Sequence, residues 1–208
     1  MRPDEIEKKS FEIISDELYE AGITLPDDKA PVIMRMIHAS ADFDYAKNTV
    51  FSDDALSSFD RYIHGALIVT DTNMALTGIN KKALTSLGAE ACCFMADRDV
   101  AEKAAEKGIT RAAVSIDKAV TITDRPLIFV SGNAPTFLIR LCEHIESGYS
   151  PALVIAMPVG FVNVEHSKEL VATSGVPFIA AMGRKGGSYI AAAAVNALMY
   201  RLIERKSL

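Results

Sequence analysis

Five short apolar runs, all from residue 66 onward, predict buried strands. They are Ala66–Val69, Ala91–Phe94, Leu127–Val130, Ala152–Met157 and Phe178–Ala181. The segments between them carry apolar residues three and four positions apart, as amphipathic helices do. Strands that alternate with helices form a parallel sheet, and continuously apolar strands are covered on both faces. The pattern predicts an α/β, doubly wound fold with a five-stranded parallel sheet and helices on both faces.

Prolines and glycines mark the ends of the predicted helices. Four helices alternate with the strands: Asp99–Lys107, a segment from Pro135 to just before Gly148, Glu165–Ser174 and Ser188–Glu204. Three more precede the first strand, over Asp4–Ala21, Pro31–Ala39 and Asp53–His64. No linker rich in Pro, Gly or Ser and no internal repeat divides the chain. We expect one domain over residues 1–208.

Composition and charge exclude several classes of protein. Half of the residues are apolar and 24% are charged, which excludes a disordered or collagen-like chain. The net charge is −5, and the first 28 residues alone carry −6. With no basic stripe elsewhere, we expect no nucleic-acid partner. Cys92, Cys93 and Cys142 form no CxxC motif or disulfide framework, so core packing in a reducing compartment is expected.

No segment predicts a membrane or secretory protein. The most apolar stretches, Pro151–Val162 and Tyr189–Tyr200, have 12 residues each, and a membrane-spanning helix needs about 20. The opening residues lack the apolar core of a secretory signal. We therefore expect a cytoplasmic protein that binds no membrane.

The candidate chemistry lies where the predicted strands end, because open parallel sheets bind ligands beyond the carboxyl ends of their strands. The segments there are Thr70–Met74, Ala96–Asp99, Ser131–Pro135, Met157–Phe161 and Met182–Ser188. In the last of these, glycines, a helix N-terminus and the cations Arg184 and Lys185 favour an oxyanion ligand. A solvated turn is the alternative. Neither GxxxxGK[ST] nor GxGxxG is present, so ATP and NAD are not supported and no cofactor is predicted.

His38 is the candidate proton donor. It ends the second predicted helix, where the helix dipole stabilises an imidazolium. The alternative is a capping histidine bonded to a terminal carbonyl. Asp42 and Asp44 are candidates to orient its ring. His64, His144 and His166 lack a partner set for a metal, no GxSxG motif is present, and neither a metal site nor covalent catalysis is predicted.

Ser10 and Arg111 are open candidates. Ser10 falls on the apolar side of the first helix, where a serine either bonds the carbonyl four residues earlier or faces a ligand. Arg111 follows Thr110, which could cap a helix. A solvated side chain is usual for an arginine at such a place, and the alternative is that its guanidinium binds a carboxylate.

Taken together, several short motifs resemble one family. They are Lys9–Ile14, Arg35–Ala39, Gly132–Thr136, Met157–Val162, Glu165 with Ser167 and Lys168, Gly175–Pro177 and Gly183–Ser188. Their order and spacing, from about residue 6 to about residue 200, are similar to those of the precorrin-8X (cobalt-precorrin-8) methylmutases of cobalamin biosynthesis. One departure is that acidic residues follow His38, where some relatives have none.

The resemblance implies an isomerase that moves a methyl group from C11 to C12 of a corrin-type macrocycle, giving hydrogenobyrinate or cobyrinate. It implies a flavodoxin-like homodimer whose site lies near the subunit interface. The family's catalytic histidine matches His38, its site serine Ser10 and its site arginine Arg111. A methyl shift needs protonation and a fixed ring but no redox cofactor.

The macrocycle's carboxylate arms need cations and N–H donors, and its faces need apolar cover. Candidates for the arms are Arg111, Gly132, Asn133, Arg184, Lys185, Gly186 and Gly187. Met157, Val159 and Phe161 are candidates for the faces, with plain core packing beside the fourth predicted strand as the alternative. Two alternatives stay open: a tetrapyrrole carrier without turnover, and a flavodoxin-like enzyme that binds a nucleotide phosphate at Gly183–Ser188.

Overall fold

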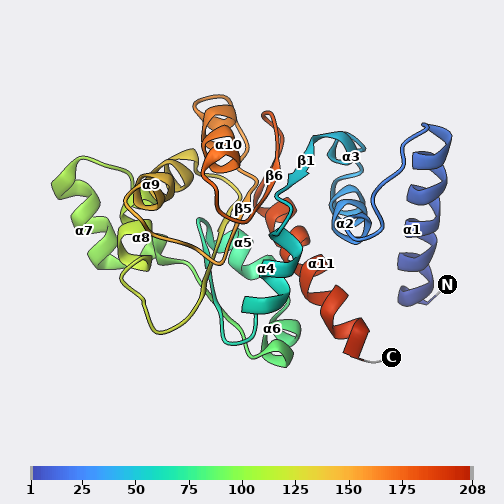
Figure 1. Cartoon of the computed structure of the whole chain (residues 1–208), viewed down its shortest axis with the longest axis horizontal. Coiled ribbons are helices and arrows are strands. Elements are labelled where there is room, and N and C mark those ends of the chain that lie inside the picture. The colour runs from blue at the N-terminus through green and yellow to red at the C-terminus, as the bar shows by residue number, and fades with distance from the viewer. Residues whose placement is uncertain (1, 207–208) are drawn as a thin grey trace.

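A six-stranded sheet forms the centre of the protein in a computed structural model that describes residues 2–206 (Figure 1). Its strands are β1 (Thr49–Phe51), β2 (Leu67–Thr70), β3 (Glu90–Cys92), β4 (Leu127–Ser131), β5 (Leu153–Ala156) and β6 (Phe178–Ala181). They lie in the order β1-β6-β5-β4-β2-β3, with β2 to β6 parallel. The predicted α/β class is confirmed, but the predicted count of five strands is wrong. The sixth strand, β1, is a short antiparallel edge strand with Thr49 opposite Ala181.

The seven predicted helices are present, each with ends within two residues of the prediction. They are α1 (Pro3–Glu20), α2 (Ala30–Ser40), α4 (Ala55–Tyr62), α7 (Arg98–Lys107), α9 (Pro135–Glu146), α10 (Val164–Thr173) and α11 (Ser188–Lys206). The short elements α3 (Tyr45–Asn48), α5 (Asn73–Gly78), α6 (Lys81–Leu87) and α8 (Arg111–Ala119), and the 3-10 turn Phe94–Ala96, complete the chain. Thr110 caps α8 by accepting the Ala113 N–H at 3.2 Å.

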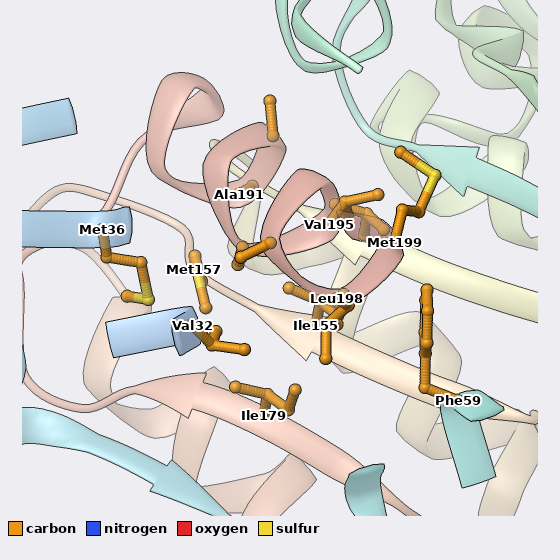
Figure 2. Packing of buried hydrophobic residues seen from close by; sticks show 14 of the residues in the cluster. Val32, Met36, Phe59, Ile155, Met157, Ile179, Ala191, Val195, Leu198 and Met199 are labelled. Atoms are coloured by element: carbon orange, nitrogen blue, oxygen red, sulfur yellow. The ribbon is translucent and has the colours of Figure 1, made fainter. Parts of the chain in front are cut away.

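Side chains that alternate along the strands build a separate core on each face of the sheet. Ile155 of β5 points to the face covered by α2, α4 and α11, and its neighbour Val154 points to the face covered by α8, α9 and α10. Figure 2 shows Val195 and Leu198 of α11 packed above Ile155. The alanine-rich sequence of α11 lets this helix lie close to the strands and to α2.

The order of the parallel strands reverses between β2 and β4, since β3 lies on one side of β2 and β4 on the other. In doubly wound sheets the loops beyond this point diverge and leave a crevice for ligands. The helix α1 lies at one end of the molecule, against α2 (Figure 1). In the part of the chain that is described, no helix is both long enough and apolar enough to cross a bilayer.

Candidate functional site

His38 lies exposed in the last turn of α2. Its ring stacks on Phe11 of α1, with centroids 5.2 Å apart and planes inclined by 24°. Among residues 2–206, no group forms a hydrogen bond with either ring nitrogen. The end of α2 is instead closed by Ser40, which donates to the Met36 carbonyl at 2.8 Å, and by Ala41 in the left-handed conformation. A capping role for His38 is therefore wrong. One face of its ring stacks on Phe11, and both ring nitrogens are available to bind a ligand.

The residues around His38 fix its position across the contact between α1 and α2. Arg35, one turn earlier on α2, places its guanidinium 4.7 Å from the centre of the Phe11 ring and pairs with Glu7. Ser10, next to Phe11, donates to the carbonyl of Ile6 at 3.0 Å, the local bond that is usual for a helical serine. Phe11 and Arg35 belong to motifs of the resemblance, but the sequence reasoning assigned neither a role.

Asp42 and Asp44 bind Lys185 rather than His38. The Lys185 ammonium donates to Asp42 at 2.8 Å and to Asp44, and this contact lowers the pKa of the Asp42 carboxyl. The predicted orientation of His38 by these carboxylates is thus wrong. The ion pairs do bring the segment after His38 beside the loop Gly183–Ser188, two regions that are far apart in the sequence.

The glycines of the loop Gly183–Ser188 allow close packing against the end of β5. A Cβ on Gly186 would lie 2.3 Å from the carbonyl oxygen of Met157, and the Gly187 N–H donates to that oxygen at 2.8 Å. A Cβ on Gly132 would likewise meet the backbone of Ser188 at 2.5 Å. The loop is a packed turn, not the flexible solvated turn considered from the sequence.

We expect Gly186→Ala to lower the free energy of unfolding by about 1–3 kcal/mol, as overpacking of a tight contact does. The obstacle is backbone oxygen, which cannot rotate away as a side chain can. Urea denaturation measures the effect, and an alanine variant as stable as the parent would contradict this packing.

Asp71 occupies the point where the strand order reverses. This fully buried residue follows β2 and accepts four hydrogen bonds from the last residue of β4 and the loop after it. The donors are the Ser131 hydroxyl at 2.9 Å and the N–H groups of Gly132, Asn133 and Ala134 at 2.8, 2.8 and 2.6 Å. Burial keeps the pKa of Asp71 raised in spite of these donors. The N–H groups that could hold a ligand anion here already hold this carboxylate.

Lys168 is fully buried on α10, and its side chain binds the backbone of the loop Gly183–Ser188. Its ammonium donates to the carbonyls of Gly183 at 2.7 Å and Lys185 at 2.8 Å. Burial lowers the pKa of Lys168 to about 8, although the carboxylate of Glu165 acts to raise it. No role was predicted for Lys168 from the sequence. Its spacing from Val164 and Val171 places all three residues on the buried face of α10, and this spacing could have indicated a buried lysine.

This pKa makes stability depend on pH with a definite sign. In the unfolded chain the lysine has its ordinary pKa of 10.5, so between pH 8 and 10.5 the unfolded state binds a proton that the folded state has released. The free energy of unfolding of the parent, relative to Lys168→Met, should therefore rise by about 2–3 kcal/mol from about pH 7 to about pH 10. Urea denaturation of both proteins over this range measures it, and a difference independent of pH would refute it.

Arg111 lies apart from His38 in this chain. It is exposed at the start of α8, which lies toward one end of the molecule, whereas α2 lies toward the other (Figure 1). Asn133 is exposed after β4. Within one chain, the structure brings the segment after His38 to Lys185 but does not bring Arg111 to the same place.

Exposed apolar side chains border the loops at the carboxyl ends of the strands. Phe161 is 84% exposed and Val162 78% exposed, and Val159, Met74 and Tyr189 are also exposed. The Arg184 guanidinium lies 5.6 Å from the centre of the Phe161 ring and its Nε lies 3.1 Å from Glu165. Met157 is completely buried and belongs to the core (Figure 2), so of the two roles considered for it, core packing is correct and cover for a ligand is wrong.

Comparison with known proteins decides the family. The family model CbiC, described as precorrin-8X methylmutase, matches residues 5–201. The chain belongs to the precorrin-8X methylmutase family. This confirms the resemblance and the isomerase class that it implied.

Relatives of the methylmutase family match this chain over nearly its whole length. A protein of Salmonella typhimurium named cobalt-precorrin-8 methylmutase is 44% identical over 98% of this chain and 97% of its own. One of Pseudomonas aeruginosa named precorrin-8X methylmutase is 36% identical over 93% of each chain. A crystal structure of the precorrin-8X methylmutase of Thermus thermophilus superposes with a TM-score of 0.86 and 38% identity, over 98% of this chain and 99% of that one.

The other histidines differ from His38 in their surroundings. The His64 ring contacts the carbonyl of Leu87 at 3.0 Å, and the His144 ring contacts Asp117 at 2.8 Å beside Arg140. Across the described residues, no group of three or more His, Cys, Asp or Glu side chains is arranged to hold a metal ion.

Proposed function

We propose that this protein moves a methyl group from C11 to C12 of precorrin-8, in its metal-free or cobalt form, to give hydrogenobyrinate or cobyrinate, with His38 as the general acid. The observation that carries the proposal is the state of the His38 ring. It is exposed, stacked on Phe11, and unbonded at both nitrogens within the described chain.

In this proposal the chemistry needs a proton and a fixed ring. His38 donates a proton to the macrocycle near the migrating methyl group, which eases the shift from C11 to C12 and leaves a neutral imidazole to take a proton back. No electrons enter or leave, so the step requires no redox partner. A positioned general acid contributes about 10²- to 10⁴-fold to a rate.

The acidic arms of the macrocycle would be held by Arg184 and Lys185, which would exchange their contacts with Glu165 and with the Asp42 and Asp44 pair for the carboxylates of the substrate. The exposed Asn133 side chain would be a further contact, and Ser10 would hydrogen-bond beside His38. The glycines at the edge of the site, Gly132, Gly186 and Gly187, would shape it by allowing close packing of backbone segments. The N–H groups of Gly132 and Gly187 would not bind the substrate, because they already donate to partners within the protein. The exposed side chains of Phe161 and Val159 offer apolar cover for the ring.

We further propose a homodimer of flavodoxin-like subunits in which the partner supplies the site arginine. The fold assignment rests on the order of the parallel strands, β3-β2-β4-β5-β6. The dimer rests on the separation of α8, which begins at Arg111, from α2, which carries His38 in its last turn, because these two helices of one chain lie toward opposite ends of the molecule (Figure 1). Cytoplasmic location stays a prediction.

Mixed dimers test this arrangement. Co-expressed His38→Ala and Arg111→Ala chains, purified through two different tags, should regain up to half of the parent's turnover, because one site then combines an intact His38 with the partner's intact arginine. Each variant alone should be nearly inactive. A mixed dimer as inactive as the variants would place both residues in one subunit.

A nucleotide enzyme that binds a phosphate at Gly183–Ser188 is disfavoured by the packing of that loop. The Gly187 N–H already donates to the Met157 carbonyl at 2.8 Å, and Gly186 packs against the same carbonyl. At the start of α9, the N–H groups that could hold a phosphate already donate to Asp71.

Turnover separates the proposed enzyme from a carrier. The parent, mixed with precorrin-8 or its cobalt form, should convert the visible spectrum of the substrate into that of the product. A carrier would change the spectrum only in proportion to the amount of substrate that it binds.

A further inference from the structure

We propose that Lys168 is a positioning residue of the methylmutase reaction: it holds the loop Gly183–Ser188 so that Arg184 and Lys185 face the acidic arms of the substrate. This rests on the proposed function. Lys168 does not touch the substrate itself, because its side chain is completely buried. It acts through the backbone of the loop.

The anchor consists of two hydrogen bonds from one ammonium. Lys168 donates to the carbonyl of Gly183 at 2.7 Å and to that of Lys185 at 2.8 Å, so Arg184 lies between the two bonded carbonyls. Burial of an ammonium without an ion pair is costly, and an apolar side chain of similar length would avoid that cost. What the amine adds at this place is the pair of bonds to the loop.

Further contacts join the loop Gly183–Ser188 to α10 and to the segment before it. Glu165, one turn before Lys168, lies 3.1 Å from the Nε of Arg184, and the Gly160 N–H donates to the Arg184 carbonyl at 3.2 Å. Beyond the loop, the Lys185 side chain binds Asp42 and Asp44, in the segment that follows His38. The chain of contacts thus runs from buried Lys168 to the loop and on to the end of α2.

Two variants and one matched control test the proposal. Lys168→Met removes both bonds at nearly constant volume, and Lys168→Gln, with a donor that is one atom shorter, serves if the methionine variant does not fold. The control is Ser167→Ala. Ser167 is equally buried on the same helix, but its hydroxyl donates only to the carbonyl of Val164, at 2.8 Å, within that helix.

The first measurement is the rate of trypsin cleavage after Arg184 and Lys185 in folded protein, followed by mass spectrometry. We expect the rate to rise at least tenfold in the Lys168 variants and to change less than twofold in Ser167→Ala. Equal rates in parent and Lys168 variants, or an equal rise in the control, would overturn the anchor. This assay contains no substrate, so it judges the anchor even if the proposed function fails.

The second measurement separates positioning from a merely structural role. In the Lys168 variants the KM for precorrin-8 should rise at least fivefold while kcat stays within twofold, since loss of folded protein would lower the apparent kcat and leave KM unchanged. Ser167→Ala should keep both values. An unchanged KM in a folded Lys168 variant would overturn the proposal. A parent without turnover would instead overturn the proposed function.

Discussion

Replacing His38 with alanine is expected to lower the rate of methyl migration by about 10²- to 10⁴-fold, the contribution of a positioned general acid. The fold should persist, because the side chain is exposed and makes no hydrogen bond within the described residues. Binding of the macrocycle should change little, because the cations that hold its arms remain. The rate follows from the change in visible spectrum, and binding from an absorbance titration.

His166→Ala is the matched control. His166 is also exposed but lies on α10 rather than beside the contact of α1 with α2. It should turn over at the parent's rate. A His38→Ala protein that kept the parent's rate would show that His38 is not the general acid. A variant that lost binding to the same extent as turnover would make His38 a binding residue instead.

Asp71→Ala is expected to cause a large loss of stability, about 3–5 kcal/mol. The substitution leaves the hydroxyl of Ser131 and the N–H groups of Gly132, Asn133 and Ala134 without their shared acceptor in a buried place. Such a loss is a large fraction of the 5–15 kcal/mol that is typical of a folded domain. Guanidinium denaturation measures it.

An exposed aspartate provides the comparison for Asp71. Asp124 is 75% exposed in its side chain and lies 4.0 Å from Arg125, a surface pair of the kind that contributes little. Asp124→Ala should therefore change the free energy of unfolding by less than about 0.5 kcal/mol. If Asp71→Ala were equally mild, Asp71 would not be what joins the loops after β2 and β4.

The buried strands and the long helices were predictable because one pattern specifies each of them. Leu127–Val130 is apolar at every position, which fits a strand covered on both faces, and Pro135 with Gly148 brackets α9. β1 was missed because only Phe51 of its three residues is buried, so neither an apolar run nor an alternation was visible. An edge strand of three residues is set by its pairing with β6, which is a tertiary contact.

Some residues of the candidate site were predictable from the sequence, but the contacts between them were not. His38 and Lys185 could be chosen by residue type and position, yet the partner of Lys185 proved to be the Asp42 and Asp44 pair that had been assigned to His38. Asp71 and Lys168 were missed because their partners are backbone amides and carbonyls. Every residue except proline carries both of those groups, and only the fold decides which of them meet.

The most direct test of the central claim uses precorrin-8 carrying a ¹³C label in the methyl group at C11. After incubation with the parent protein, without any added cofactor, the labelled methyl signal should move in the NMR spectrum from its position on C11 to that on C12, while the mass of the macrocycle stays unchanged. A macrocycle that binds but keeps its label on C11, in both the metal-free and the cobalt form, would contradict the assignment.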